Sequence, residues 1–237
     1  MSESLLKIEG LNAFYGKAHI LFDVALEVRR GEVVALMGRN GAGKSTTMKA
    51  AMGLLDKMHG KVRFRGQDIS VMEPYRIAQM GLGFVPEDRR IFTDLTVLEN
   101  LEVGRRPARE GMRAWTPERL FNLFPNLGEM PDRLGGRMSG GEQQMLTVSR
   151  TLMGNPYMVL LDEPSEGVAP VIAEQMANMI LELKKEGMSI LLSEQNAHFA
   201  ELVSDRVYVL EKGQIRYQGS MQELSENEEV RRAYLEV

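Results

Sequence analysis

Short apolar runs alternate with longer amphipathic segments along most of the chain. The runs Val33–Met37, Tyr157–Leu161 and Ile190–Ser193 each predict a buried strand, because nearly all of their residues are apolar. The segments Lys44–Met52 and Val171–Glu186 predict helices among these strands. Strands that alternate with helices favour a mainly parallel sheet that is covered by helices on both faces.

Other segments predict antiparallel strands, because they flank short turns or alternate in polarity. We therefore expect an α/β fold with a mixed, mainly parallel sheet. About residues 1–30 and 60–70 are expected to form an antiparallel β subdomain beside it. The strands predicted in this way are Leu5–Phe14, Ile20–Val28, Lys61–Arg65, Arg206–Leu210 and Gln214–Gln218.

The interval from about residue 94 to residue 137 contains no convincing strand. Thr96 and Glu99 have the spacing of a capping box, and Thr116 precedes a proline at a first helical position. We expect a helical insert over about 94–137, with a linker at Gly135-Gly136, inside a single domain that spans 1–237. The remaining predicted elements are a strand at Leu82–Val85, helices at Pro74–Met80, Ala197–Val203 and Met221–Leu235, and a helix capped by Ser139 that runs to about Met153.

Composition narrows the range of functions. The formal net charge of −4 gives no reason to expect nucleic acid as the main partner, and the absence of cysteine excludes disulfides and thiolate metal sites. The start Met1–Ser4 has none of the features of a signal peptide, and no apolar run approaches the roughly 18 residues of a membrane span. A function at a membrane would therefore require docking onto another protein.

The segment from Gly38 to Ser45 matches the phosphate-loop pattern G-x-x-x-x-G-K-[ST] between a predicted strand and a predicted helix. In this pattern, backbone N–H groups surround phosphates, Lys44 contacts the β- and γ-phosphates, and the Ser45 hydroxyl ligates Mg²⁺. The motif alone indicates a nucleoside triphosphate. The candidate nucleotide-binding residues of this region are Gly38, Asn40, Gly41, Gly43, Lys44, Ser45 and Thr46.

Two acidic residues, Asp162 and Glu163, end a predicted buried strand. In a phosphate-loop protein we expect Asp162 to hold Mg²⁺, often through water, and Glu163 to act as the general base on the attacking water. An acidic helix start beyond the strand is the alternative.

The run Ser139-Gly140-Gly141-Glu142-Gln143 is the most discriminating motif. By itself it could be a simple helix cap. Between a phosphate loop and an Asp-Glu strand end, a helix N-terminus with two glycines is a second anion-binding device. We therefore expect two copies of such a chain to share each nucleotide in a two-fold dimer.

Together, these three motifs resemble those of the ATPase subunits of ABC transporters, and the resemblance covers essentially the whole chain. It implies a P-loop NTPase core that binds and hydrolyses ATP with Mg²⁺. It also implies a head-to-tail dimer in which Ser139 and Gly141 of one subunit face the γ-phosphate held by the other, with Gly140 and Gln143 in the same site. Tyr15 is implied to stack on adenine; a surface turn aromatic is the alternative.

Three positions depart from the family's usual pattern. Glu87 stands where a glutamine is usual, and we expect its carboxylate to approach Mg²⁺ or its water. Gln195 stands where a histidine usually contacts the γ-phosphate, and its amide can still donate a hydrogen bond. The segment 165–170 lacks the usual aspartate that helps to couple the two sites.

These departures together resemble the LivF-type ATPases of branched-chain amino acid importers. That resemblance implies membrane permeases as partners, a second ATPase that is a paralogue or a second copy, and an indirectly linked periplasmic binding protein. It places the chain peripherally at the cytoplasmic face of the inner membrane. Importers of urea, short amides or other amino acids are alternatives, as is an ABC-type ATPase of DNA repair or chromosome maintenance. That last class normally carries a long coiled-coil insert, and no sustained heptads occur here.

Overall fold

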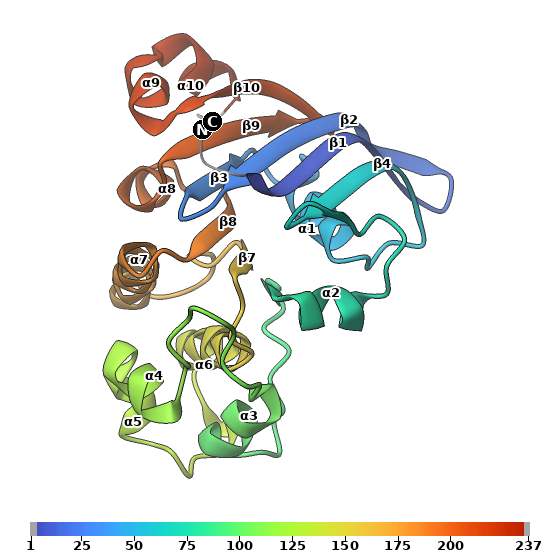
Figure 1. Cartoon of the computed structure of the whole chain (residues 1–237). Helices are drawn as coiled ribbons and strands as arrows, with labels where there is room; N and C mark the ends of the chain where they lie inside the picture. Colours follow the sequence, from blue (N-terminus) through green and yellow to red (C-terminus); the bar gives the residue numbers. More distant parts are fainter. Residues whose placement is uncertain (1–3, 235–237) are drawn as a thin grey trace.

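The computed structural model describes residues 4–234 and contains two sheets of different kinds (Figure 1). The larger sheet has the strand order β10-β9-β3-β8-β7-β6, and all of its pairings are parallel except that of β9 with β10. The prediction of a mixed, mainly parallel sheet is therefore confirmed. Its strands are β3 (Val33–Met37), β6 (Leu82–Val85), β7 (Met158–Asp162), β8 (Ser189–Glu194), β9 (Arg206–Glu211) and β10 (Gln214–Ser220).

The smaller sheet is antiparallel, with the strand order β2-β1-β4-β5. Its strand β4 begins at Lys57 rather than at the predicted Lys61, because Met58 is the single apolar residue between Lys57 and Gly60 and sets no alternating pattern. The short strand β5 has no apolar residue and was not predicted. The strands of this sheet are β1 (Ser4–Tyr15), β2 (Ala18–Arg29), β4 (Lys57–Phe64) and β5 (Gln67–Asp68).

Most of the predicted helices are present within a residue or two of their expected bounds. The single predicted helix Met221–Leu235 is wrong, because the chain breaks at Asn227, whose Oδ1 accepts a hydrogen bond from the N–H of Val230. Leu235 itself lies outside the described residues. The helices outside the interval 94–137 are α1 (Lys44–Ala51), α2 (Pro74–Met80), α6 (Gly140–Leu152), α7 (Pro170–Lys185), α8 (Ala197–Val203), α9 (Met221–Glu226) and α10 (Glu228–Tyr234).

Short helices occupy the interval between β6 and α6, at the end of the molecule remote from α9 and α10 (Figure 1). They are α3 (Val97–Gly104), α4 (Pro117–Leu123) and α5 (Pro125–Gly128), and the predicted capping box of Thr96 and Glu99 is present. The predicted linker at Gly135-Gly136 is wrong. Both residues begin a 3₁₀ turn (Gly135–Arg137), and their N–H groups donate to the carbonyls of residues 95 and 93. The grouping of residues 94–137 into one insert stays a prediction.

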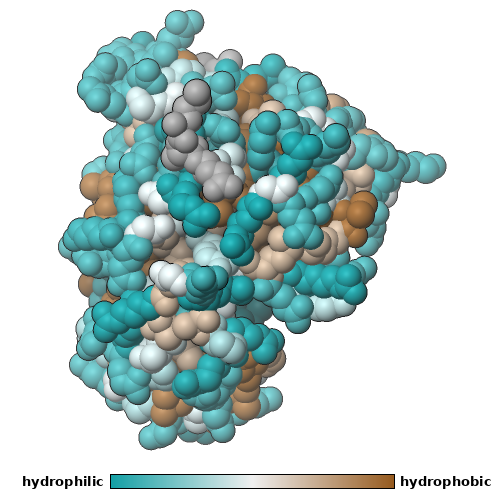
Figure 2. All heavy atoms as spheres, in the orientation of Figure 1, coloured by the Kyte–Doolittle hydropathy of each residue, from teal (hydrophilic) through white to brown (hydrophobic). Residues whose placement is uncertain are grey.

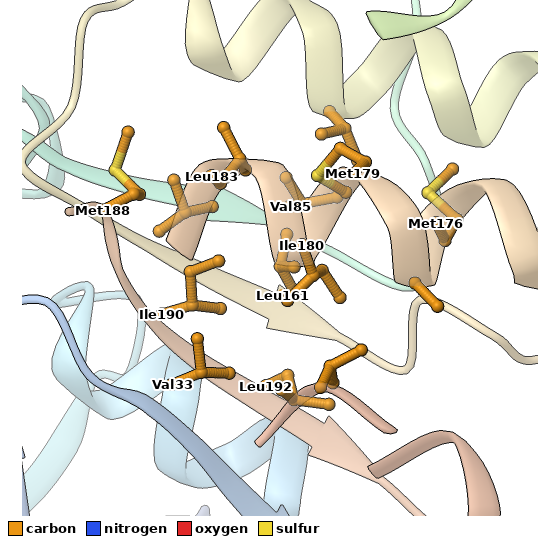
Figure 3. Packing of buried hydrophobic residues seen from close by; sticks show 14 of the residues in the cluster. Val33, Val85, Leu161, Met176, Met179, Ile180, Leu183, Met188, Ile190 and Leu192 are labelled. Atoms are coloured by element: carbon orange, nitrogen blue, oxygen red, sulfur yellow. The ribbon is translucent and has the colours of Figure 1, made fainter. Parts of the chain in front are cut away.

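The central strands β3, β7 and β8 of the larger sheet are buried on both faces, which explains their nearly unbroken apolar runs. Alternate residues of β3 point to opposite sides: Val33 joins one hydrophobic cluster with α6 and α7, and Val34 joins the other with α1 and the antiparallel sheet. Figure 3 shows Met176, Met179 and Met188 among the aliphatic side chains of the first cluster. Flexible methionines fill irregular gaps between helix and sheet, as their scattered occurrence in the sequence indicates.

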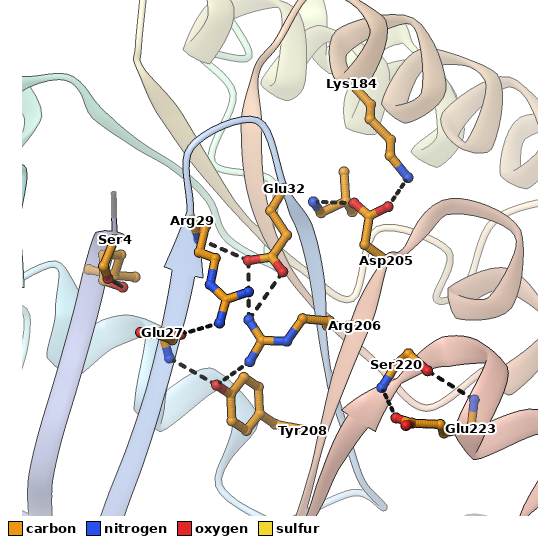
Figure 4. Close-up of polar contacts among 12 residues, drawn as sticks. Ser4, Glu27, Arg29, Glu32, Lys184, Asp205, Arg206, Tyr208, Ser220 and Glu223 are labelled. Carbon is orange, nitrogen blue, oxygen red and sulfur yellow. Dashed lines mark hydrogen bonds and ion pairs between the residues drawn. The ribbon is translucent and has the colours of Figure 1, made fainter. Parts of the chain in front are cut away.

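A polar network joins the two sheets at their ends (Figure 4). The Arg206 guanidinium donates to Glu32 at 3.1 Å and to the Tyr208 hydroxyl at 2.8 Å, and that hydroxyl accepts from the N–H of Glu27 on β2. Nearby, the Asp205 carboxylate accepts from the N–H of Val33 and pairs with Lys184 on α7. The network therefore fixes β2, β3, β9 and α7 relative to one another.

The face seen in Figure 2 is mainly hydrophilic, and its hydrophobic patches are small and separated. Within residues 4–234, no helix combines the length and the apolar character that a membrane crossing requires.

The network predicts that Arg206 stabilises the fold. Replacing it by methionine keeps most of the side-chain volume but leaves Glu32, whose side chain is 11% exposed, without its cation. We expect the free energy of unfolding of Arg206→Met to fall by about 1–3 kcal/mol, measured by urea denaturation. Lys185→Met is the control, because it removes an exposed ion pair with Glu182 and should cost no more than about 0.5 kcal/mol. Equal effects of the two changes would contradict the role of the network.

Candidate active site

The phosphate loop, Gly38–Ser45, connects the end of β3 to the start of α1. A Cβ atom at position 38 would lie 2.2 Å from the carbonyl oxygen of Leu210, so only glycine fits against β9. Gly43 caps α1 in the left-handed region, at φ +111°, where glycine is favoured. Between Gly38 and Gly43, the residues Asn40 and Gly41 are exposed, whereas Thr46 is buried in the first turn of the helix. The middle of the loop therefore faces solvent.

Lys44 is buried beneath this loop, with 3% of its surface exposed. Its Nζ donates to the carbonyl oxygen of Gly38 at 2.8 Å and lies 2.9 Å from Oε1 of Glu163. The structure therefore brings together the predicted phosphate-binding lysine and the predicted general base.

Ser45 and Asp162 also meet, as the sequence predicts for two groups that serve one cation. The Ser45 hydroxyl donates to Asp162 Oδ1 at 3.0 Å, and the Ser193 hydroxyl donates to the same oxygen at 2.6 Å. Burial raises the pKa of Asp162, although these two hydrogen bonds oppose the shift. A hydroxyl and a carboxylate are oxygen donors of the kind that Mg²⁺ prefers, so these residues fit that ion.

Glu163 has an unusual backbone, with φ at +48°, in the left-handed region that non-glycine residues seldom adopt. Its N–H donates both to the carbonyl oxygen of Ser193, at 3.2 Å, and to the Ser193 hydroxyl, at 3.0 Å. Strain of this kind persists only where surrounding contacts enforce it, and it is concentrated at functional sites. Ser193 supplies those contacts, and its place at a predicted strand end is the one feature of the sequence that could have indicated it.

The Glu163 carboxylate lies within a group of polar partners. Besides the Lys44 ammonium, Oε2 accepts a hydrogen bond from Nε2 of Gln195 at 3.2 Å, so the predicted Gln195 also joins the site. Burial opposes ionisation of Glu163, but hydrogen bonds from Glu166, Lys44 and Gln195 and the charge of Lys44 outweigh it and lower its pKa. The carboxylate is therefore ionised and able to accept a proton.

Glu166 belongs to this group and was missed by sequence reasoning. A hydrogen bond with Glu163, then burial and the negative charges of Glu163 and Glu87, raise the pKa of Glu166 to about 7. Its N–H also donates to the carbonyl oxygen of Glu163 at 3.1 Å, which closes a turn. Its spacing of three residues from Glu163 is the one signal that could have indicated it.

The segment Ser139–Gln143 begins α6 as a capping box, in which Ser139 and Glu142 satisfy each other's backbone N–H groups. The helix-cap interpretation is thus correct locally, while a contact with phosphate stays a prediction. Gln143 donates to the carbonyl oxygen of Gly135 at 3.1 Å, and a Cβ at Gly140 would lie 2.6 Å from the Arg89 guanidinium. Among the described residues, no hydrogen bond links this segment to the phosphate loop.

Two predicted residues lie at the margin of the site. Tyr15 ends β1 with 48% of its surface exposed, and its stacking on a base stays a prediction. Glu87 is exposed in the segment after β6, and its charge acts on Glu166. No hydrogen bond within residues 4–234 joins Glu87 to Ser45 or Asp162, so its role as a metal ligand stays a prediction.

Comparison of the sequence with known proteins identifies related families and relatives. The profile of a family described as ABC transporter matches residues 21–166. The high-affinity branched-chain amino acid transport ATP-binding protein BraG of Pseudomonas aeruginosa is 41% identical, with 98% of this chain and 99% of that protein covered. The lipopolysaccharide export system ATP-binding protein LptB of Haemophilus influenzae is 35% identical, with 98% and 97% covered.

Two solved structures are similar to this chain in fold. An ATP-binding cassette of an ABC transporter, in its ADP conformation, superposes with a TM-score of 0.78 at 30% sequence identity, covering 94% of each chain. A nucleotide-free cassette from an ABC transporter gives a TM-score of 0.79 at 29% identity, covering 96% of this chain and 97% of that one.

The carboxyl pair of Glu163 and Glu166 predicts a pH dependence of stability. Because the folded-state pKa of Glu166 is raised from 4.5 to about 7, its stabilising contribution is fully present below about pH 4.5 and is lost as the pH rises through about 7. Glutamine at position 166 keeps a donor for Glu163 at every pH. We expect urea denaturation to show wild type losing stability relative to Glu166→Gln between about pH 5.5 and about pH 8. Parallel pH profiles of the free energy of unfolding would contradict the raised pKa of Glu166. Glu182→Gln, at an exposed position of α7, is the control.

Proposed function

The chain belongs to the ABC transporter family as one of its ATPases, and we propose that it supplies the energy for import of branched-chain amino acids. The observation that carries its ATPase chemistry is the meeting of Lys44, Asp162, Glu163 and Gln195 beside the phosphate loop. The relatives and the motifs around Glu87 and Gln195 support the proposed cargo.

In the proposed reaction, the backbone N–H groups of Gly38–Ser45 and the Lys44 ammonium bind the β- and γ-phosphates of ATP. Lys44 now pairs with Glu163, so phosphate oxygens can replace the carboxylate as its partner and release Glu163 toward water. Glu163 then accepts the proton of the attacking water, for which its lowered pKa keeps it ionised. Gln195, which already touches Glu163, donates its amide hydrogen toward the γ-phosphate.

Mg²⁺ would be held by Ser45 and Asp162, with Glu87 as a further candidate. When bound, Mg²⁺ neutralises phosphate charge. Ser193 contributes by donating a second hydrogen bond to the Asp162 oxygen that accepts from the Ser45 hydroxyl.

Each nucleotide site is proposed to be completed by a second ATPase subunit. The start of α6 offers the N-terminal end of a helix and the small residues Ser139, Gly140 and Gly141, which suit a partner's γ-phosphate. Gln143 supports the turn from which this segment projects. Tyr15 would cover the adenine from its exposed place on β1. The partner ATPase can be a second copy or a paralogue.

A cavity of 820 Å³ between α2, β6, α6 and the segment 103–110 is a candidate site for the membrane permease. Exposed Tyr75, Phe92 and Val103 line it, and exposed apolar side chains that surround a cavity suit a protein partner. Through the permease, the chain would lie peripherally at the cytoplasmic face of the inner membrane. A periplasmic binding protein would act on it only indirectly.

The choice of cargo rests on two observations. BraG is more similar to this chain than LptB is, at 41% against 35% identity. The motifs around Glu87, Glu166 and Gln195 also resemble the LivF type. Lipopolysaccharide export is a second candidate, because LptB covers the chain equally well. Importers of urea or short amides remain alternatives within the same class, whereas the relatives named above give no support to a role in DNA repair.

If Glu163 is the general base, a change at this position should stop ATP hydrolysis without stopping ATP binding. Glu163→Gln removes the proton acceptor but keeps the side-chain shape. We therefore expect ATP turnover to fall by about 100- to 10,000-fold while ATP binding and a stable dimer persist. Phosphate release, nucleotide binding and size-exclusion chromatography measure these properties. Glu182→Gln on α7 is the control, and rapid hydrolysis by Glu163→Gln would remove Glu163 from this role.

The cargo is tested in proteoliposomes that contain this ATPase with its own permeases and binding protein. We expect leucine, isoleucine or valine to stimulate ATP turnover and to be taken up in an ATP-dependent way, with uptake abolished by Glu163→Gln. Stimulation by urea or short amides alone would move the assignment to those importers. Co-purification with lipopolysaccharide-binding components, without uptake of amino acids, would favour export.

A further inference from the structure

We propose that Glu194 is a positioning residue for ATP hydrolysis. This inference rests on the proposed roles of Glu163 and Gln195. Glu194 is the last residue of β8 and lies between Ser193 and Gln195, which both contact the Asp162-Glu163 segment. Among residues 4–234, the Glu194 side chain makes no hydrogen bond or ion pair with the phosphate loop.

The Glu194 carboxylate is buried, with 1% of the residue surface exposed. No ion pair within residues 4–234 involves it. A buried carboxylate without a cation is costly, so its oxygens need hydrogen-bond donors from the protein.

Both oxygens of Glu194 accept backbone hydrogen bonds, and each bond goes to a functional segment. Oε1 accepts from the N–H of Ser165 at 3.1 Å, two positions after Glu163. Oε2 accepts from the N–H of Asn196 at 3.3 Å, the residue that follows Gln195 and caps α8. One rigid carboxylate therefore fixes the distance between the loop after the base and the loop that carries the amide donor.

This bridge explains how Glu163 keeps its strained backbone. Ser193 holds the N–H of Glu163 from one side, and Glu194 holds the N–H of Ser165 beyond it. The turn from Glu163 to Glu166 is thus anchored at two points on the end of β8. Loosening the second anchor would let the turn relax and move the Glu163 carboxylate away from Gln195.

The test compares variants of Glu194 by kcat, by KM for ATP and by thermal unfolding. Glutamine matches the shape of Glu194, but its NH₂ group must face one of the two backbone N–H groups from which the carboxylate now accepts a hydrogen bond. We expect Glu194→Gln to lower kcat by about 10- to 100-fold and to change KM by less than about twofold, because the phosphate loop is untouched. Glu194→Asp keeps both oxygens and should recover part of the kcat.

Ser189→Ala is the matched control on the same strand. The Ser189 hydroxyl is buried and accepts from the N–H of Gly31 at the end of β8 remote from the site. We expect it to lower the unfolding temperature without lowering kcat. If kcat of Glu194→Gln stays within about twofold of wild type, or if both variants lose kcat in proportion to stability, the positioning role is wrong.

The same experiment separates this inference from the proposed function. Slow hydrolysis by Glu163→Gln with normal kcat for Glu194→Gln would overturn the positioning role alone. Rapid hydrolysis by Glu163→Gln would overturn the base role on which it rests. If Glu194→Gln does not fold, Glu194→Asp decides: a lowered kcat at unchanged KM supports the inference, and a wild-type kcat overturns it.

Discussion

The parallel pairing of β8 with β3 on one side and β7 on the other is the constraint on which the site depends. Its register sets Met37 beside Glu194 and Asp162 beside Ser193, so three strands end at one edge. Chain segments far apart in sequence thereby deliver the phosphate loop, the acidic pair and Gln195 to one place. Parallel strands make this possible because all of their carboxyl ends lie on the same side of the sheet.

A second connection runs from the site to the cavity. The carbonyl oxygens of Arg89 and Arg90 accept hydrogen bonds from Thr147 and Arg150 on α6, and the Arg150 guanidinium lies over the Phe92 ring. The segment after Glu87 is therefore attached along a helix whose first residues form the Ser-Gly-Gly motif. The continuous helix α6 therefore links the segment that lines the cavity to the Ser-Gly-Gly motif at its own N-terminal end.

The sequence predicted the residues that belong to known motifs better than the residues that hold those motifs in place. Motif spacing identified Lys44, Asp162 and Glu163, and apolar periodicity identified the strands that carry them, because both signals are local. The supporting roles of Ser193 and Glu194 were not predicted, since their contacts form only when β8 pairs with β7. Asn227 is a smaller example of this limit. The tail is charged and favours a helix throughout, so its sequence does not indicate the break between α9 and α10, where the Asn227 side chain caps the second helix.

The left-handed backbone of Glu163 has a consequence for how this chain can evolve. A glycine would adopt φ +48° without strain, whereas the glutamate keeps its conformation only through its neighbours. The residue that would make the fold most relaxed at this position is therefore one that carries no carboxylate. Substitution at this codon therefore exchanges one cost for another, because glycine relieves the backbone strain but leaves the buried Lys44 ammonium without its carboxylate partner.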